Sequence, residues 1–262
     1  MIGVVVGVGA CSDGESNDET PTVAAPAYSL VNPGNLTICT HAPYEPFEMQ
    51  VDGDWTGFDM DLINAVAEGL ELETNVVVTP FDGIWRQPAA GACDLVASAL
   101  TITEARAAET LFTDPYFEAA QSLLVRADDA ETYSTLESLA GRSIAVQEGT
   151  TGEAYAQEHL PPGAELVAYT EPAPMFLALQ SQHVDAILQD LPVNGFRSTQ
   201  DATVALTQRF TTGEQYAFAV APDNPGLAEA INAELADIRE ASVYDQIYLK
   251  WFGAIDDGEP TE

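Results

Sequence analysis

Short β-branched runs alternate with helical patterns along most of this 262-residue chain, and this alternation constrains the fold more than any other feature. Runs that predict strands lie at 36–40, 73–80, 94–100, 120–126, 143–147, 165–169, 186–189 and 217–221. Phe58, Leu62, Val66 and Leu70 fall four residues apart and predict a helix between the first two runs. Further helices are expected up to residue 158, over 173–182, and as one long stretch over 227–252. This order is typical of α/β proteins.

The order of the elements predicts two lobes, each a mostly parallel sheet flanked by helices. Residues 29–125 and 220–253 are assigned to the first lobe, and residues 126–219, with the crossing segments, to the second. The chain is long enough for two units that each bury a core. It is expected to cross between them near residues 120–127 and 214–222, and such paired crossings form a hinge.

The charge balance excludes several classes of partner. Forty-two acidic residues face eight basic ones, which gives a formal net charge of -34, and Lys250 is the single lysine. Nucleic acids and anionic lipid surfaces are bound through clusters of Lys and Arg, so neither is an expected partner. We interpret the carboxylates as a solvated coat suited to a salty medium, where repulsion between like charges is screened.

The N-terminal segment has the pattern of an exported lipoprotein. An apolar run at 2–10 has the length of a signal-peptide core and ends in Val8-Gly9-Ala10-Cys11, which resembles the lipobox of bacterial lipoproteins. Residues 1–10 are therefore expected to be a signal peptide, Cys11 the lipidated residue and 11–28 a disordered tether. No Lys or Arg precedes the run, which departs from the usual signal peptide and favours a start further upstream. Residues 254–262 form an acidic tail.

Two cysteines remain once Cys11 is assigned to the anchor. In an oxidising compartment, a disulfide between Cys39 and Cys93 is the economical hypothesis. Cys39 falls late in one predicted strand and Cys93 just before another, so parallel neighbours would leave them out of step. Two buried free thiols are the competing hypothesis.

A colinear set of motifs runs through both predicted lobes. In order, these are 40–48 (THAPYEPFE), 57–62 (GFDMDL), 81–84 (FDGI), 97–106 (ASALTITEAR), 112–117 (FTDPYF), 145–151 (AVQEGTT), 184–186 (VDA), 190–192 (DLP) and 244–253 (YDQIYLKWFG). The set closely resembles the extracellular solute-binding proteins of polar amino acid ABC importers, bacterial family 3. The resemblance covers roughly residues 35 to 253, and the shared order makes it specific.

The resemblance implies the two-lobed fold of type II periplasmic binding proteins and a role in transport rather than catalysis. The protein would capture an α-amino acid, polar or neutral, in the cleft between its lobes and close around it. It would deliver this ligand to a transporter permease as a monomer anchored, through its lipid alone, to the outer face of the cytoplasmic membrane. No cofactor or metal is implied.

The resemblance also assigns roles to individual residues. Arg106 would grip the ligand carboxylate with its planar guanidinium, assisted by backbone N–H groups at Thr101 and Thr151. Asp190 would pair with the α-ammonium, together with the carbonyl of Ala99. Each charge of a buried zwitterion needs such a partner.

The remaining predicted contacts belong to the ligand side chain or to the same motifs. Tyr44 and Phe81 would form aromatic walls, with Trp85 one helical turn further on. His41 stands where several relatives carry aspartate, and this difference argues mildly against a strictly cationic ligand. The predicted set is completed by Ser98, Leu100 and Thr150.

Two other functions are compatible with the pattern. The resemblance extends to periplasmic cyclohexadienyl dehydratases, for which His41 and Glu48 are the candidate acid or base near the cleft. The second alternative is a ligand-sensing module. The three histidines, His41, His159 and His183, lack the spacing of metal ligands.

Overall fold

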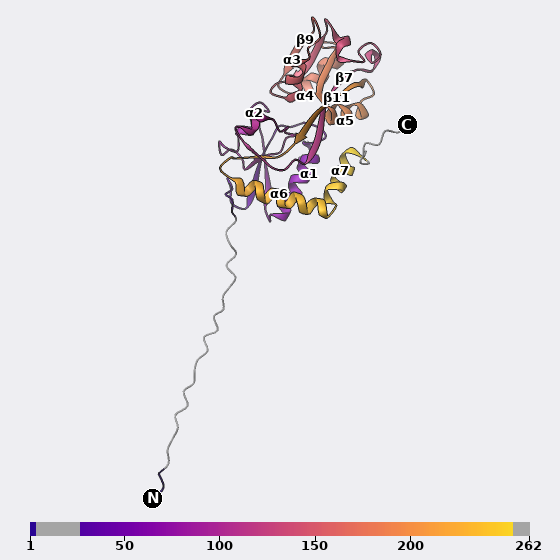
Figure 1. The fold of residues 1–262 in the computed structure, drawn as a ribbon. Coiled ribbons are helices and arrows are strands. Elements are labelled where there is room, and N and C mark those ends of the chain that lie inside the picture. The colour runs from indigo at the N-terminus through magenta and orange to yellow at the C-terminus, as the bar shows by residue number, and fades with distance from the viewer. Residues whose placement is uncertain (4–26, 254–262) are drawn as a thin grey trace.

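The computed structural model describes residues 1–3 and 27–253, and residues 27–253 form two lobes, each built around a five-stranded sheet (Figure 1). The sheet of lobe 1 has the strand order β4 (Glu73–Val78), β1 (Asn35–Thr40), β5 (Leu95–Val96), β12 (Ala219–Val220) and β6 (Leu111–Phe112). Its helices are α1 (Phe58–Gly69), α2 (Glu104–Ala107), α6 (Pro225–Glu240) and α7 (Val243–Phe252). A hairpin of β2 (Met49–Val51) and β3 (Asp54–Thr56) and a 3₁₀ turn, η1 (Ile84–Arg86), complete this lobe.

Lobe 2 has the strand order β11 (Val204–Tyr216), β7 (Phe117–Arg126), β10 (Ala186–Asp190), β8 (Ser143–Gln147) and β9 (Glu165–Tyr169). Its helices are α3 (Thr151–Glu158), α4 (Pro172–Gln180) and α5 (Leu191–Gln200), with short 3₁₀ turns η2 (Ala127–Asp129) and η3 (Leu136–Leu139). In each sheet one strand runs against the others, β12 in lobe 1 and β7 in lobe 2. The predicted mostly parallel sheets are therefore confirmed.

The amphipathic pattern of α1 shows how sequence determines packing in lobe 1. Phe58, Leu62 and Val66 are fully buried against the sheet, whereas Leu70 lies just beyond the helix as its C-terminal cap. Phe47 packs edge-on against the rings of Phe58 and neighbouring aromatics, at centroid separations typical of such pairs. Helices α6 and α7 cover the same side of the molecule as α1 (Figure 1).

Two long antiparallel strands, β7 and β11, connect the lobes. They pair along their whole length, from Val204 opposite Arg126 to Tyr216 opposite Phe117, with irregularities in register near residues 207 and 211–213. At its end β11 also forms a bridge to lobe 1, between Tyr216 and Thr101. Figure 1 shows both strands passing from one lobe to the other. The crossings therefore lie slightly earlier along the chain than the sequence predicted.

Two predicted elements differ from the structure, and two observed elements were not predicted. The strand expected over 94–100 is reduced to β5, because Ala99 has a φ of 44° and donates its N–H to the Asp59 carboxylate at 2.7 Å. The long C-terminal helix is divided by Ser242, whose φ of 58° interrupts the helical geometry. Strand β11 and helix α5 were not predicted, since the irregular pairing of β11 obscures its alternation.

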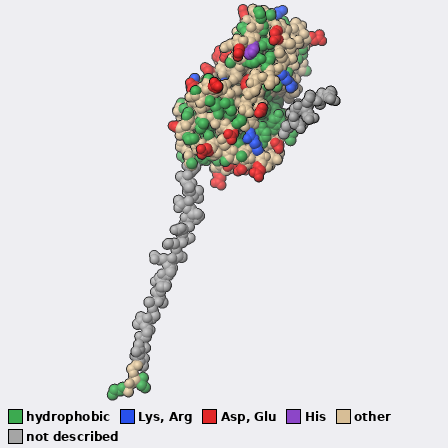
Figure 2. Space-filling model, in the orientation of Figure 1, with side chains coloured by type: hydrophobic (Ala, Val, Ile, Leu, Met, Phe, Trp, Pro, Cys, Tyr) green, Lys and Arg blue, Asp and Glu red, His purple; other side chains and the backbone are tan. Residues whose placement is uncertain are grey.

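The termini carry predictions that the structure does not address. The proposed lipidation site and residues 11–26 of the proposed tether lie within 4–26, and the acidic tail is residues 254–262, all outside the described residues. In the part of the chain that is described, no helix combines the length and the apolar character needed to cross a bilayer. Figure 2 shows acidic side chains scattered over both lobes, with few basic ones among them.

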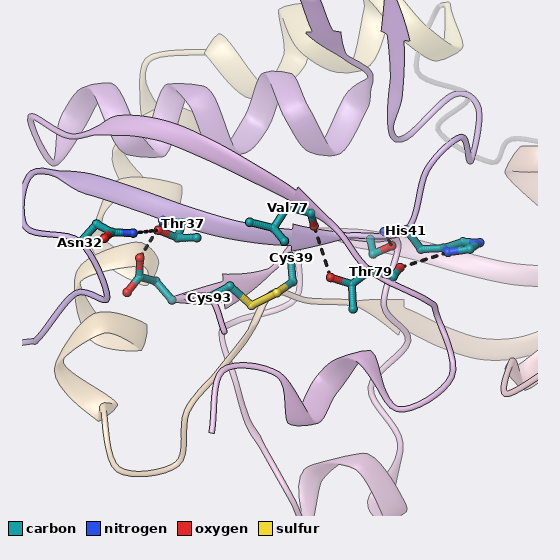
Figure 3. Close-up of a disulfide and its surroundings, with 9 residues drawn as sticks. Asn32, Thr37, Cys39, His41, Val77, Thr79 and Cys93 are labelled. Atoms are coloured by element: carbon teal, nitrogen blue, oxygen red, sulfur yellow. Dashed lines mark hydrogen bonds between the residues drawn. A yellow bond between two sulfur atoms is a disulfide. The ribbon is translucent and has the colours of Figure 1, made fainter. Parts of the chain in front are cut away.

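The structure joins Cys39 and Cys93 in a disulfide, with their Cα atoms 5.7 Å apart (Figure 3). Cys39 lies in β1, and Cys93 lies two residues before β5. Between Cys93 and the strand, the Asp94 carboxylate accepts hydrogen bonds from the backbone N–H groups of Thr37 and Val31, both at 2.6 Å. These bonds hold the chain against β1, which compensates for the offset that left the pairing open.

We expect replacement of both cysteines, Cys39→Ala and Cys93→Ala, to lower the free energy of unfolding by about 2–4 kcal/mol, because the bond closes a chain segment with a sequence separation of 54 residues. Urea unfolding measures this loss. Dithiothreitol serves as the control, since it should destabilise the wild type and leave the double variant unchanged. If dithiothreitol leaves the free energy of unfolding of the wild type unchanged, the disulfide is contradicted.

Candidate functional site

A cavity between the two lobes brings together most of the predicted site. The space it encloses is only about 10 Å³, because its two walls lie close together. Its walls are Tyr44, Phe81, Ala99, Thr101, Arg106, Gln147, Thr150, Thr151 and Asp190. The first five belong to lobe 1 and the last four to lobe 2, so the cavity exists only where the lobes face each other.

Arg106 is a buried cation that contacts both lobes. It lies in α2, a short helix capped by the Thr103 hydroxyl, and its side chain is only 5% exposed. The guanidinium donates to the carbonyl of Thr101 in lobe 1 at 2.8 Å and to that of Gly149 in lobe 2 at 3.0 Å. The Phe81 ring lies within cation–π distance. Burial lowers the Arg106 pKa, and the negative charges of nearby carboxylates oppose this.

Asp190 supplies negative charge from the opposite lobe. It is the last residue of β10 and caps the start of α5, so the end of a parallel strand delivers its side chain to the cleft. Its carboxylate accepts hydrogen bonds from the hydroxyls of Tyr44 and Tyr216, both at 2.7 Å, and from the Gln121 amide at 2.6 Å. Burial raises the Asp190 pKa to about 6, and repulsion from Glu214 adds to the rise.

The turn between β8 and α3 requires glycine where the lobes meet. Gly149 has a φ of 75°, and a Cβ atom there would lie only 3.0–3.2 Å from Asp82 in lobe 1. The next residue, Thr150, caps α3 by accepting the Glu153 N–H at 3.0 Å. Thr151 then opens the helix, so the backbone N–H groups of its first turn lie beside the cavity. This is a favourable place for an anion.

Four predicted site residues do not line the cavity. Ser98 is buried and donates to Glu48 at 3.0 Å, and Leu100 packs in the core around the disulfide. His41 is buried, with one ring nitrogen 3.2 Å from the Thr79 carbonyl (Figure 3) and the other 3.2 Å from the Glu171 carboxylate of lobe 2. Trp85 stacks against the Arg106 guanidinium, 5.0 Å from the ring centre, behind the cavity wall.

Sequence reasoning missed four polar residues of the cleft. Gln147, at the end of β8, lines the cavity directly. Gln121, Glu214 and Tyr216 lie on the crossing strands and reach the site through hydrogen bonds with its members. The first of these strands was predicted without a role for its polar residues, and the second was not predicted. The pairing of the two crossing strands brings these residues to the cleft. A single sequence carries no direct signal for that pairing.

Two fully buried carboxylates, Glu48 and Asp59, lie beneath the lobe 1 wall of the cleft. Asp59 accepts hydrogen bonds from the Ala99 N–H and the Tyr116 hydroxyl, both at 2.7 Å. Burial raises the Asp59 pKa to about 7, and it raises the Glu48 pKa well above its usual range. Within the described residues, no group of three or more His, Cys, Asp or Glu side chains is arranged to hold a metal ion.

The raised pKa of Asp59 makes its contribution to stability dependent on pH. A carboxyl group with a folded pKa above its unfolded value of about 3.9 stabilises the fold when protonated, and this contribution is lost as pH rises through the folded pKa, here about 7. We expect the free energy of unfolding of the wild type, relative to that of Asp59→Asn, to fall between about pH 4 and about pH 7, the interval between the unfolded and the folded pKa. Urea unfolding across this range measures it. The exposed Asp54→Asn is the control, and parallel curves for both variants would refute the assignment.

The profile of the bacterial extracellular solute-binding proteins, family 3, matches residues 36–254. The histidine-binding periplasmic protein of Escherichia coli K12 is 30% identical over 241 residues, which cover 87% of this chain and 91% of the relative. The lysine/arginine/ornithine-binding periplasmic protein of the same strain is also 30% identical, covering 88% and 92%. An ancestral arginine-binding protein solved with bound glutamine superposes with a TM-score of 0.78 at 33% identity, covering 84% of this chain and 99% of that one.

Proposed function

Because this chain belongs to the bacterial extracellular solute-binding proteins of family 3, we propose that it binds a polar α-amino acid between its lobes and delivers it to the permease of an ABC importer. The observation that carries the proposal is the convergence of Arg106 and Asp190 on one cavity. An α-amino acid presents one carboxylate and one ammonium, and each must be paired when buried. A guanidinium and a carboxylate across a single cleft meet both requirements.

The division of these charges between the lobes explains how binding is coupled to closure. Arg106 belongs to lobe 1, whereas Asp190 and the first turn of α3 at Thr151 belong to lobe 2. A zwitterion contacts both sets only when the lobes are together, so it binds the closed form more tightly and shifts the equilibrium toward it. The permease would then recognise the closed form.

A binding role agrees better with this cleft than an enzymatic one. The relatives described above are named as binding proteins. His41 and Glu48, the candidate acid or base from the sequence, do not line the cavity, and Glu48 is fully buried beside Ser98. The ligand would instead be held by fixed hydrogen bonds and charges, with Tyr44 and Phe81 against its side chain.

We place the protein outside the cytoplasm, attached to the membrane by lipid on Cys11. The periplasmic relatives and the Cys39–Cys93 bond, which persists in oxidising compartments, support the location. The sequence Val8-Gly9-Ala10-Cys11 supports the attachment. Acyl chains anchor a protein without any spanning helix, and two or more are needed for stable binding.

Removing the guanidinium should abolish ligand binding. We expect Arg106→Ala to lose all detectable binding of the L-amino acids that raise the melting temperature of the wild type, because the ligand carboxylate would be buried without a partner. Arg106→Lys should bind weakly, since it keeps the charge but loses the planar fork. Thermal-shift titration followed by calorimetry measures both effects.

The control for these variants is Arg142→Ala, which removes an exposed arginine of lobe 2 that packs over Tyr133 rather than in the cleft. It should bind as the wild type does. Circular dichroism reports whether each variant is folded. A folded Arg106→Ala protein with unchanged affinity would overturn the proposed binding mode.

The anchor is tested separately from binding. Expressed in a bacterium that processes lipoproteins, with basic residues added before the apolar run at 2–10, the wild type should fractionate with membranes, and Cys11→Ser should be released because it has no sulfur to acylate. Partition into the detergent phase of Triton X-114 provides the measurement. Soluble wild type, or Cys11→Ser protein that stays with membranes, contradicts lipidation at this residue.

A further inference from the structure

Glu214 is a half-buried carboxylate of crossing strand β11 whose contacts span both lobes. One of its oxygens accepts the hydroxyl of Thr101, in lobe 1, at 3.0 Å and the hydroxyl of Thr151, in lobe 2, at 2.8 Å. The Gln121 amide lies 3.2 Å from both Glu214 oxygens. A single carboxylate thus connects the two walls of the cleft from the strand that joins them.

These bonds fix the polarity of the two threonines that line the cavity. A hydroxyl group has one proton to donate and two lone pairs to accept with. With that proton directed to Glu214, Thr101 and Thr151 present lone pairs to any other partner. Their hydroxyls therefore attract N–H donors and repel a carboxylate, so the ligand carboxylate is left to Arg106 and to backbone N–H groups.

The same carboxylate is electrostatically linked to Asp190. The Gln121 amide donates to Asp190 at 2.6 Å and to Glu214, so it lies between the two acidic groups. Their repulsion contributes to the raised pKa of Asp190. A cation placed between the lobes relieves this repulsion, and the ammonium of an amino acid is such a cation.

We propose that Glu214 joins the two lobes around the bound amino acid and makes the Thr101 and Thr151 hydroxyls hydrogen-bond acceptors toward its ammonium group. This inference rests on the proposed function. It assigns Glu214 as a positioning residue, which acts on the ligand through the two threonines and Asp190 rather than by lining the cavity.

Two substitutions of Glu214 distinguish the effect of its charge from the effect of its side-chain length. Glu214→Gln removes the charge, and the expected result is an affinity at neutral pH reduced about tenfold or more, the loss typical of a hydrogen bond to a charged group. Glu214→Asp keeps the charge on a shorter side chain and should also weaken binding.

Calorimetry with L-arginine, L-histidine and L-glutamine measures these affinities. The matched control is Glu118→Gln, which removes an exposed carboxylate from the neighbouring crossing strand.

The titration of Asp190 is the decisive readout, because it reports the charge at position 214 even where no ligand binds. In carbon-13 NMR of the ligand-free protein, Glu214→Gln should lower the Asp190 pKa from about 6, whereas Glu118→Gln should not. Ligand binding by Glu214→Gln should then persist to lower pH than in the wild type. An unchanged Asp190 titration overturns the inference, whether or not any probe binds.

A double-mutant cycle tests the role of the threonine hydroxyl. Thr151→Val should weaken binding in the wild-type background and cause little further loss in Glu214→Gln, because the two groups act as one unit. Additive losses would show that the hydroxyl acts independently of Glu214 and would contradict the proposal. A wild type that binds none of the three amino acids contradicts the proposed function instead, and the Asp190 titration still decides the role of Glu214.

Discussion

The burial of one guanidinium between two lobes is the constraint on which the rest of the cleft depends. Arg106 is 5% exposed, and its two protein acceptors, the carbonyls of Thr101 and Gly149, come from opposite lobes. Burying an isolated cation costs several kcal/mol, so negative charge must lie nearby. Asp190 and Glu214 provide it. The close approach of the lobes, the glycine at position 149 and the acidic groups opposite are therefore parts of one electrostatic arrangement.

The crossing strands give this arrangement its position in the fold. Because β7 and β11 pair from one lobe into the other, their polar residues lie where both lobes can be contacted. Gln121 on β7 and Glu214 and Tyr216 on β11 use that position to contact Asp190 or the cavity threonines. A change in the angle between the lobes must therefore alter these hydrogen bonds. The strands that join the lobes therefore also carry residues that contact the site.

The sequence predicted the fold class and most of the cavity because local patterns and colinear motifs determine both. Strands such as β8 and β9 were found at their observed bounds, and the motifs around Arg106 and Asp190 led to residues that do converge. The role of Glu214 depends on pairing between distant strands, and one sequence contains no direct signal for such pairing. The positive φ of Ser242 that divides the last helix was hidden for a different reason, since serine has no marked preference for that geometry.

The charges inside the cleft need a different explanation from those on the surface. Most of the 42 acidic residues need no hydrogen-bond donor or cation from the fold, because water and salt screen their charges. Asp190 is held by three hydrogen-bond donors and is still shifted toward protonation, which shows that these donors do not fully replace water. In the proposed function, a zwitterion would bring one ammonium to Asp190 and Glu214 and one carboxylate to Arg106. Because each end of such a ligand would pair with a charge that the cleft buries, closure and recognition would both follow from the same buried charges.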